Sequence, residues 1–298
     1  MISSKVIDSL KNNRDKRLRG DVIAIPWSLT RLSRLLPGVE KRNYYLISAN
    51  QKSGKTQLAD FLFVIEPIEW IIRTKANIRL KILYFSLEIN SESKILQAIS
   101  YKLNKDYKIS ISPQYLRSTF GGYVLNENIL SVIQSRDFQT WLAKFESHVS
   151  YIDSIRSPDR IHAFVKGYAE KHGSHIMDGE TIVGYKPTDP DEHVIIITDH
   201  ISLLTPDAGE TLHNTMYKYS AQYCLEFRDR YGYSVVNIQQ QSASSAAQQF
   251  TSRGDSIIEK IRPSPDGLAD MKLSSRDLQE FCQKIWKCGL FYVYLYVI

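Results

Sequence analysis

The sequence predicts an α/β fold in which a mostly parallel central sheet is flanked by helices. Three observations predict it: two continuous apolar runs, HVIIITD at 193–199 and YSVVNIQ at 233–239, and a helical pattern at 216–232 between them. Such runs are typical of parallel strands covered on both faces, and parallel neighbours require a crossover connection. The chain has 298 residues, of which 43% are hydrophobic and 23% charged, which excludes a disordered or collagen-like protein. One large domain and two smaller ones are both compatible with this length.

The chain is expected to begin with a basic lead-in, residues 1–20, and to fold from Asp21 onward. The lead-in contains five basic residues, Lys11, Arg14, Lys16, Arg17 and Arg19. A solvated helix or tail accounts for such a run, and contact with phosphates or with a neighbouring subunit is the alternative. Residues 25–38, IPWSLTRLSRLLPG, then mix apolar and basic positions and end in a Pro-Gly turn signal.

A strand, a loop and a helix are predicted next. NYYLISA at 43–49 is a short aromatic and β-branched run typical of a strand. The loop NQKSG separates it from a helical pattern, KTQLADFLFVIEPIEWII, at 55–72. Because Pro67 lies inside this pattern, we expect it to kink the helix or to begin a second one.

The alternation of strands and helices continues through the middle of the chain. LKILYFSLEI at 80–89 predicts a buried strand, and SESKILQAISYKL at 91–103 predicts a helix capped by Asn90. Residues 105–150 look mostly helical, and a further strand is expected at 148–154.

The remaining segments differ clearly in composition. A Ser-Pro pair opens a predicted helix at 157–173, whereas the Gly-, Pro- and Asp-rich stretch 174–192 predicts a loop or insertion. The Gln-, Ser- and Ala-rich stretch 239–249 also predicts a loop. The ten apolar residues of 289–298 predict a buried strand, because they are too few to cross a membrane.

Composition also narrows the expected setting. The three cysteines, Cys224, Cys282 and Cys288, form no C-x-x-C pair, which argues against a disulfide framework or a zinc site. No stretch has the form of a signal peptide or reaches the ~18 apolar residues of a membrane span, so we expect a cytoplasmic protein. A net charge of +6 permits nucleic-acid binding without requiring it.

The loop at 49–56 carries the clearest chemical signal. Its residues are Ala49, Asn50, Gln51, Lys52, Ser53, Gly54, Lys55 and Thr56, and they match G-x-x-x-x-G-K-[ST] except that alanine replaces the first glycine. In such a loop the backbone N–H groups surround a β-phosphate, Lys55 reaches the β- and γ-phosphates, and the Thr56 hydroxyl holds Mg²⁺. Because the loop lies between a predicted strand and a predicted helix, we favour a nucleotide site over a structural turn.

Three polar residues at the ends of predicted strands extend this candidate site. Asp199 follows the apolar run VIIIT and fits an acidic group that holds Mg²⁺ through water, although an aspartate can also merely cap a turn. Glu88, at the tip of YFSLE, could polarise an attacking water. Gln240 ends the run VVNIQQ and could sense a γ-phosphate, and a surface glutamine is the alternative.

In this order, these elements resemble the RecA-like ATPase domain of the DnaB-type replicative DNA helicases, which form rings in bacteria and phages. IPWSLTRLSRLLPGVEKRNYYLISANQKSGKT is similar to that family's segment leading into its A-x-x-x-x-G-K-T loop, so Ala49 agrees with the family. YFSLEIN resembles its F-S-L-E-M motif, and IIITDHISLL resembles its strand followed by I-D-Y-L-Q-L. VVNIQQQS and LADMKLSS resemble its V-I-x-L-S-Q-L-N and L-S-D-L-R-x-S-G segments. The resemblance spans about residues 21–280.

The resemblance implies an ATP- and Mg²⁺-dependent motor that moves along single-stranded DNA as a hexameric ring, with a primase or loader as a candidate partner. Lys55 and Thr56 would take the nucleotide and Mg²⁺, with Asp199 holding a metal-bound water. Glu88 would be the base for water and Gln240 the γ-phosphate sensor. His200 lies where the family often has an aromatic residue, and packing in the core is its simpler interpretation.

The region after Gln240 corresponds to loops that face the central channel in such rings. The candidate DNA-binding residues there are Arg253, Lys260 and Arg262, which would give salt-dependent binding without sequence preference. A linker with incidental charge is the alternative interpretation of this region.

Two features depart from the family. Only about twenty to thirty residues precede the ATPase core, whereas the family usually carries a separate N-terminal helical domain. From about residue 279 the chain reads QEFCQKIWKCGLFYVYLYVI, which offers no clear equivalent of the family's arginine finger. We therefore expect one ATPase domain at 21–298 with an atypical C-terminal end.

Three functions remain open on the sequence alone. The leading hypothesis is a DnaB-type helicase subunit. The second is a RecA-like DNA-dependent ATPase that recombines, remodels or regulates without unwinding. The third is a nucleotide-binding interaction module that lacks turnover.

Overall fold

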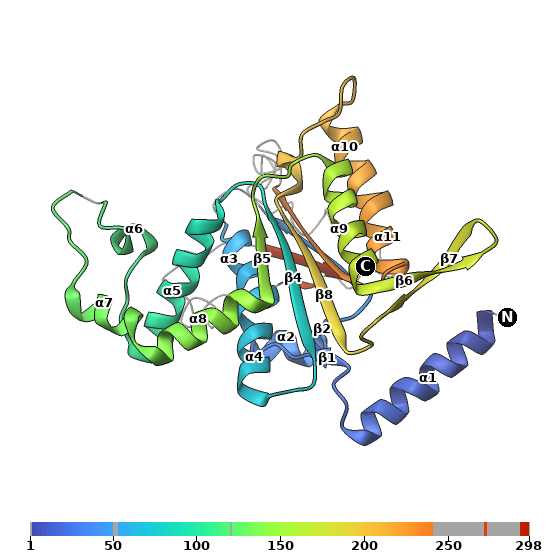
Figure 1. Ribbon diagram of the computed structural model, residues 1–298, viewed down its shortest axis with the longest axis horizontal. Helices are drawn as coiled ribbons and strands as arrows, with labels where there is room; N and C mark the ends of the chain where they lie inside the picture. Colours follow the sequence, from blue (N-terminus) through green and yellow to red (C-terminus); the bar gives the residue numbers. More distant parts are fainter. Residues whose placement is uncertain (1, 50–52, 120, 241–270, 273–292, 298) are drawn as a thin grey trace, which may run out of the picture.

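A computed structural model describes residues 2–49, 53–119, 121–240, 271–272 and 293–297 (Figure 1). Its centre is a seven-stranded sheet of order β10-β11-β3-β9-β8-β4-β5. The strands are β3 (Tyr44–Ala49), β4 (Arg79–Ser86), β5 (Val149–Ile152), β8 (Glu192–Asp199), β9 (Ser234–Gln240), β10 (Met271–Lys272) and β11 (Val293–Val297). The five strands from β3 to β5 are mutually parallel, whereas β11 pairs with β3, and β10 with β11, in the antiparallel sense. The predicted α/β class with a mostly parallel sheet is confirmed.

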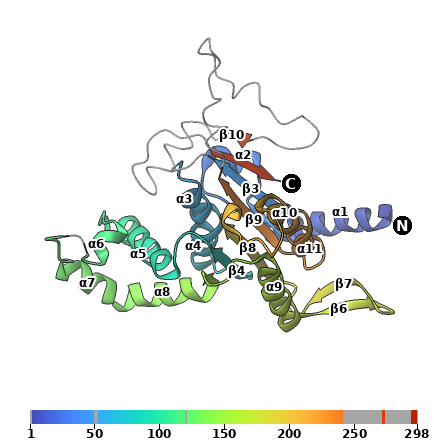
Figure 2. The same ribbon diagram turned by 90° about the horizontal axis from the view of Figure 1, so that it is seen from above.

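Helices cover both faces of this sheet (Figures 1 and 2). One face packs against α3 (Lys55–Asp60), η1 (Phe61–Ile65), α4 (Glu66–Thr74), α5 (Ser91–Tyr107) and α8 (Arg136–His148). The other packs against α9 (Pro158–His172), η3 (Tyr219–Tyr223) and α11 (Cys224–Asp229), which continue from α10 (Leu212–Lys218). Alternate residues of β8 enter the two cores, with Ile195 and Ile197 on the first face and Val194 and Ile196 on the second. This double burial explains why the strand is an unbroken apolar run.

The N-terminal segment begins with the helix α1 (Ile2–Arg19), which extends away from the sheet in Figure 1. A short antiparallel pair, β1 (Ala24–Ile25) and β2 (Val39–Glu40), then encloses α2 (Thr30–Leu35). Gly38 lies between α2 and β2 with φ +125°, and a side chain there would collide with the carbonyl oxygen of Ile25. The predicted Pro-Gly turn therefore requires glycine on two counts.

The predicted helix at 55–72 forms as three joined pieces, α3, the π-helical η1 and α4. Pro67 lies in the first turn of α4, so it begins a second helix, as one of the two expectations held. In an i→i+5 ladder the carbonyl of Leu62 faces the nitrogen of Pro67, which carries no hydrogen. The indole N–H of Trp27 donates to that carbonyl at 2.9 Å, which satisfies it from another element.

The prediction of a loop or insertion at 174–192 is wrong. The segment forms a hairpin of β6 (Gly173–Asp178) and β7 (Thr181–Pro187) that projects from the second face. Gly179 has φ +58°, so the Asp-Gly pair makes the turn, and β-branched and aromatic residues flank it. The Gly, Pro and Asp content is that of a tight turn and strand ends rather than of an unstructured insertion.

Smaller differences concern the region 80–150. The strand predicted at 80–89 ends at Ser86, and the residues after it form a bend before α5. The expected helical region 105–150 contains α6 (Pro113–Leu116), α7 (Glu127–Gln134) and α8, joined by irregular segments. The strand expected at 148–154 is present as β5 at the edge of the sheet.

Several predictions concern residues outside the described ranges. These are most of the loop at 239–249 and the three candidate DNA-binding residues Arg253, Lys260 and Arg262. Within 289–298, β11 confirms the expected strand. In the part of the chain that the structure describes, no helix is both long enough and apolar enough to cross a membrane.

Candidate nucleotide site

The carboxyl ends of β3, β9, β8 and β4 meet at one edge of the sheet, where an open α/β sheet commonly binds ligands. The loop after β3 leads there into α3. Gly54 adopts a left-handed conformation with φ +79°, and its position leaves open space where a side chain would stand. Lys55 and Thr56 are the first residues of α3 and are 6% and 7% exposed. Asn50, Gln51 and Lys52 lie outside the described residues.

Lys55 faces Gln240 across the paired strands β3 and β9. The strand register places Ala49 opposite Gln240, so the residue that enters the loop and the candidate sensor are neighbours. The Nζ atom of Lys55 lies 3.5 Å from Oε1 of Gln240, although the two residues are 185 positions apart in the chain. A lysine and an amide at this spacing can contact the same phosphate group.

Thr56 and Asp199 also come together. The hydroxyl of Thr56 donates to Oδ1 of Asp199 at 3.1 Å. Asp199 is fully buried at the end of β8, opposite Ser86 of β4 and Ile238 of β9. A hydroxyl and a carboxylate oxygen are hard oxygen ligands of the kind that Mg²⁺ prefers.

These features fit a nucleotide with its magnesium ion. Thr56 and Asp199 supply two oxygen groups close together, and Lys55 supplies the single cation expected beside β- and γ-phosphates. Gly54 leaves the loop backbone open to a close approach by phosphate. The donor set therefore matches the chemistry that the loop sequence predicts.

Beneath Asp199 lies a buried polar network that the sequence did not suggest. Tyr84, on β4, donates to Oδ2 of Asp199 at 3.0 Å. Lys94, on α5, donates to both carboxylate oxygens of Asp60 at 2.9 and 3.0 Å and to the hydroxyl of Tyr84 at 2.7 Å. The Nζ atom of Lys94 also lies 3.5 Å from Oδ2 of Asp199. The network links α3, α5, β4 and β8.

Burial dominates the electrostatics of this network. It raises the pKa of the Asp60 carboxyl, and the ammonium of Lys94 opposes that rise. It also raises the pKa of Tyr84 well above its usual range, reinforced by the negative charge of Asp199. Tyr84 therefore stays protonated and keeps its hydrogen for the Asp199 carboxylate.

One sequence signal could have found part of the network. Asp60 follows Thr56 by four residues within a helical pattern, so both side chains share one face of the helix. Nothing comparable marks Lys94, which reads as an ordinary cation in the amphipathic helix SESKILQAISYKL.

Glu88 lies outside this network, two residues after the end of β4. Its side chain is half exposed, and its Oε2 lies 3.8 Å from Nε2 of His200. The ring of His200 is buried, as its simpler interpretation predicted, and burial lowers the pKa of the imidazole. Glu88 thus stands at the same sheet edge as Asp199, but it is open to solvent.

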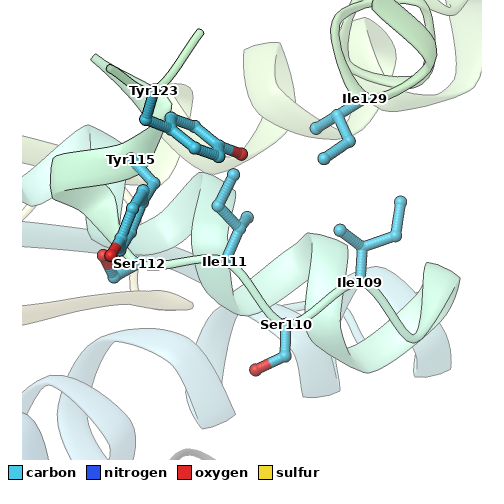
Figure 3. A pocket seen from close by; sticks show the side chains of 7 residues that line it. All are labelled: Ile109, Ser110, Ile111, Ser112, Tyr115, Tyr123 and Ile129. Carbon is cyan, nitrogen blue, oxygen red and sulfur yellow. The ribbon is translucent and has the colours of Figure 1, made fainter. Parts of the chain in front are cut away.

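A separate cavity of about 370 Å³ lies on the α5–α7 segment rather than at this site (Figure 3). Its lining is mostly apolar and consists of Ile109, Ser110, Ile111, Ser112, Tyr115, Tyr123 and Ile129. The rings of Tyr115 and Tyr123 meet edge to face with centroids 4.7 Å apart. The lining contains no carboxylate, histidine or cation, so it lacks the groups that phosphate chemistry uses.

The fold is similar to two solved structures. One is the ATPase domain of a DnaB-like helicase, with a TM-score of 0.52 and 17% sequence identity over 84% of this chain and 74% of that chain. The other is a DnaB-like replicative helicase described with its interactions with primase, with a TM-score of 0.56 and 15% identity over 89% of this chain and 60% of that chain. The present chain therefore spans less than two thirds of the second structure's length. No family model matches the sequence, and no curated protein matches it.

The fold and the loop together define an α/β protein of the RecA-like class, with a five-stranded parallel centre and a candidate nucleotide site at its carboxyl edge. More narrowly, the chain has the fold of the ATPase domains of DnaB-type helicases, as the sequence motifs predicted.

Proposed function

We propose that this chain is a DnaB-type helicase subunit that couples ATP hydrolysis to movement along single-stranded DNA. The observation that carries the proposal is the convergence of Lys55, Thr56, Asp199 and Gln240 at one edge of a RecA-like sheet. These residues come from three separate segments, and each has the chemistry that its place beside a nucleotide requires.

Each residue has a distinct part in the proposed reaction. Lys55 neutralises charge on the β- and γ-phosphates, and Gln240, in contact with Lys55, senses the γ-phosphate. Thr56 and Asp199 hold Mg²⁺, which when bound offsets negative charge on the phosphate oxygens. Glu88, half exposed at the same edge, accepts a proton from the attacking water.

The proposal extends to partners and assembly. The chain forms a homo-oligomeric ring, a hexamer, through whose channel single-stranded DNA passes, with Arg253, Lys260 and Arg262 as the proposed phosphate contacts. One similar structure is of a helicase that interacts with primase, which supports a primase as a partner here too. We further propose a single ATPase domain at 21–298 that acts in the cytoplasm, of the host if the chain is phage-encoded.

The first test is ATP hydrolysis by the purified chain, with and without single-stranded DNA, at low and high salt. We expect Lys55→Ala to lower turnover by ~10³–10⁵-fold, because a charge clamp on the transferred phosphoryl group is lost. Lys144→Ala is a matched control, since that lysine is exposed on α8. Equal turnover by the wild type and Lys55→Ala would contradict the proposed site.

A forked-duplex assay then separates the helicase from the other two hypotheses. A helicase releases the displaced strand, whereas a RecA-like ATPase that remodels or regulates hydrolyses ATP without releasing it. Tight ATP binding with no phosphate release would instead identify a nucleotide-binding module without turnover.

A further inference from the structure

Lys94 is a charged residue in a place where charge is costly. Its side chain is 1% exposed, and it projects from α5 toward the sheet rather than from the loop or from β8. A buried ammonium requires compensating partners. Asp60 supplies one carboxylate at 2.9 Å, so the pair joins α5 to α3. That ion pair alone would give Lys94 a purely structural role.

The contacts of Lys94 extend beyond that pair. Its Nζ also contacts the hydroxyl of Tyr84 at 2.7 Å and lies 3.5 Å from Oδ2 of Asp199. With Lys94 and both carboxylates ionised, the cluster has a net charge of 1 − 2 = −1, because Asp60 and Asp199 each carry one negative charge. A cation is therefore favoured on the open side of Asp199, where Thr56 lies.

The two oxygens of Asp199 face different partners. Oδ1 accepts from Thr56, the first candidate metal ligand of the loop. Oδ2 accepts from Tyr84 at 3.0 Å and lies toward Lys94. Two groups on one oxygen prevent the carboxylate from rotating, so Oδ1 keeps its direction toward Thr56.

We propose that Lys94 is a positioning residue for Asp199, holding Oδ2 together with Tyr84 so that Oδ1 stays aimed at the magnesium site. This inference rests on the proposed function, because it assigns Asp199 to the metal. Lys94 touches neither nucleotide nor metal in this arrangement and acts only through the carboxylate. Outer groups of this kind typically change metal affinity or activity by ~10–100-fold when they are replaced.

The test compares two double variants that each replace an ion pair between α5 and the α3–α4 segment. Asp60→Leu with Lys94→Met substitutes apolar side chains for the buried pair, an exchange that cores commonly tolerate. Glu69→Gln with Lys105→Met is the matched control, because Lys105 contacts Glu69 at 2.7 Å in the same pair of segments and does not contact Asp199. Thermal melting reports the fold of each variant.

The readout is ADP affinity with and without Mg²⁺, beside the Mg²⁺ concentration for half-maximal ATP turnover. For the Asp60/Lys94 variant we expect unchanged metal-free ADP affinity, at least a tenfold smaller gain from Mg²⁺, and a correspondingly higher half-maximal Mg²⁺ concentration. The Glu69/Lys105 control should match the wild type. A folded Asp60/Lys94 variant with the wild-type gain from Mg²⁺ would overturn the inference.

Tyr84→Phe keeps the test decisive if the double variant does not fold. It removes one hydroxyl between Lys94 and Asp199, so the same loss of Mg²⁺ dependence is expected in a smaller amount. A wild-type gain in Tyr84→Phe would then overturn the inference. Absence of ATP hydrolysis in the wild type counts against the proposed function alone, because the ADP measurement still decides the role of Lys94.

Discussion

Two buried polar networks lie on opposite faces of β8 and differ in charge. Asp199 points into the first, which includes the ionic groups of Asp60 and Lys94. Thr198, the preceding residue, points into the second, where its hydroxyl meets that of Tyr219 at 2.6 Å. Consecutive strand residues face opposite ways, so one step along the chain separates a charged environment from an uncharged one.

The uncharged network continues along the second face. Asn237 of β9 donates to the hydroxyl of Tyr44 at 2.7 Å and contacts the thiol of Cys224. Burial raises the pKa of that thiol to about 12, so it stays protonated. Hydroxyl, amide and thiol groups satisfy one another there without any buried ion. The difference teaches that this fold buries charge beside the candidate phosphate site and uses neutral hydrogen bonds where only packing is needed.

Breaking the charged network should have the largest effect on stability. Lys94→Met leaves the carboxylates of Asp60 and Asp199 buried without their cation, which is expected to lower the free energy of unfolding by about 3–5 kcal/mol. Urea denaturation measures the change. Adding Asp60→Leu should recover most of the loss, because one buried charge disappears with the other. A loss below about 1 kcal/mol in the single variant would mean that the network is hydrated and not ionic in the way described here.

The sequence predicted the first network only in part. Asp199 could be identified because a long apolar strand ends at it, and Lys55 and Thr56 because a short contiguous pattern defines their loop. Lys94 could not, because its partners lie 10 to 105 positions away and meet only when α5 packs on the sheet. Local patterns specify strands and loops, whereas a buried pair between distant helices depends on tertiary packing.

The same limit explains the fold. The runs at 43–49, 193–199 and 233–239 became β3, β8 and β9 because double burial demands continuous apolar sequence. The hairpin at 173–187 was missed because its exposed strands carry no such run, and only the Asp-Gly turn marks it. Solvent-exposed strands need less apolar sequence, so their signal is weaker.

A titratable group at the opposite end of β8 sharpens the comparison. His193 is buried and hydrogen bonded to Ser234 at 2.9 Å, and burial, aided by the charge of Lys41, lowers its pKa to about 3. The folded state therefore keeps the ring neutral, whereas the unfolded chain takes up a proton below its ordinary pKa of 6.5. Stability from this group is complete above pH 6.5 and is lost as the pH falls toward 3.

For the wild type, this linkage should lower the free energy of unfolding by about 2 kcal/mol between pH 7 and pH 5. His193→Gln preserves a hydrogen-bonding side chain but does not titrate, so its unfolding free energy should fall less over the same interval. Urea denaturation at several pH values measures both proteins. Parallel pH profiles for the two would show that His193 is not the group that responds.

The smallest expected effect belongs to Thr198. Thr198→Val keeps the shape of the side chain and the β-branching that suits a strand, but it removes the hydrogen bond to Tyr219. The expected loss is about 1 kcal/mol in the free energy of unfolding, with ATP turnover unchanged. Asp199→Asn, one residue further and equally conservative in shape, should instead abolish Mg²⁺-dependent turnover, because the amide cannot supply the carboxylate charge next to Thr56. Unfolding and turnover measured on both variants set the two faces of β8 directly against each other. If Thr198→Val also lowered turnover, the uncharged network would have to transmit to the nucleotide site, and the division between the two faces would fail.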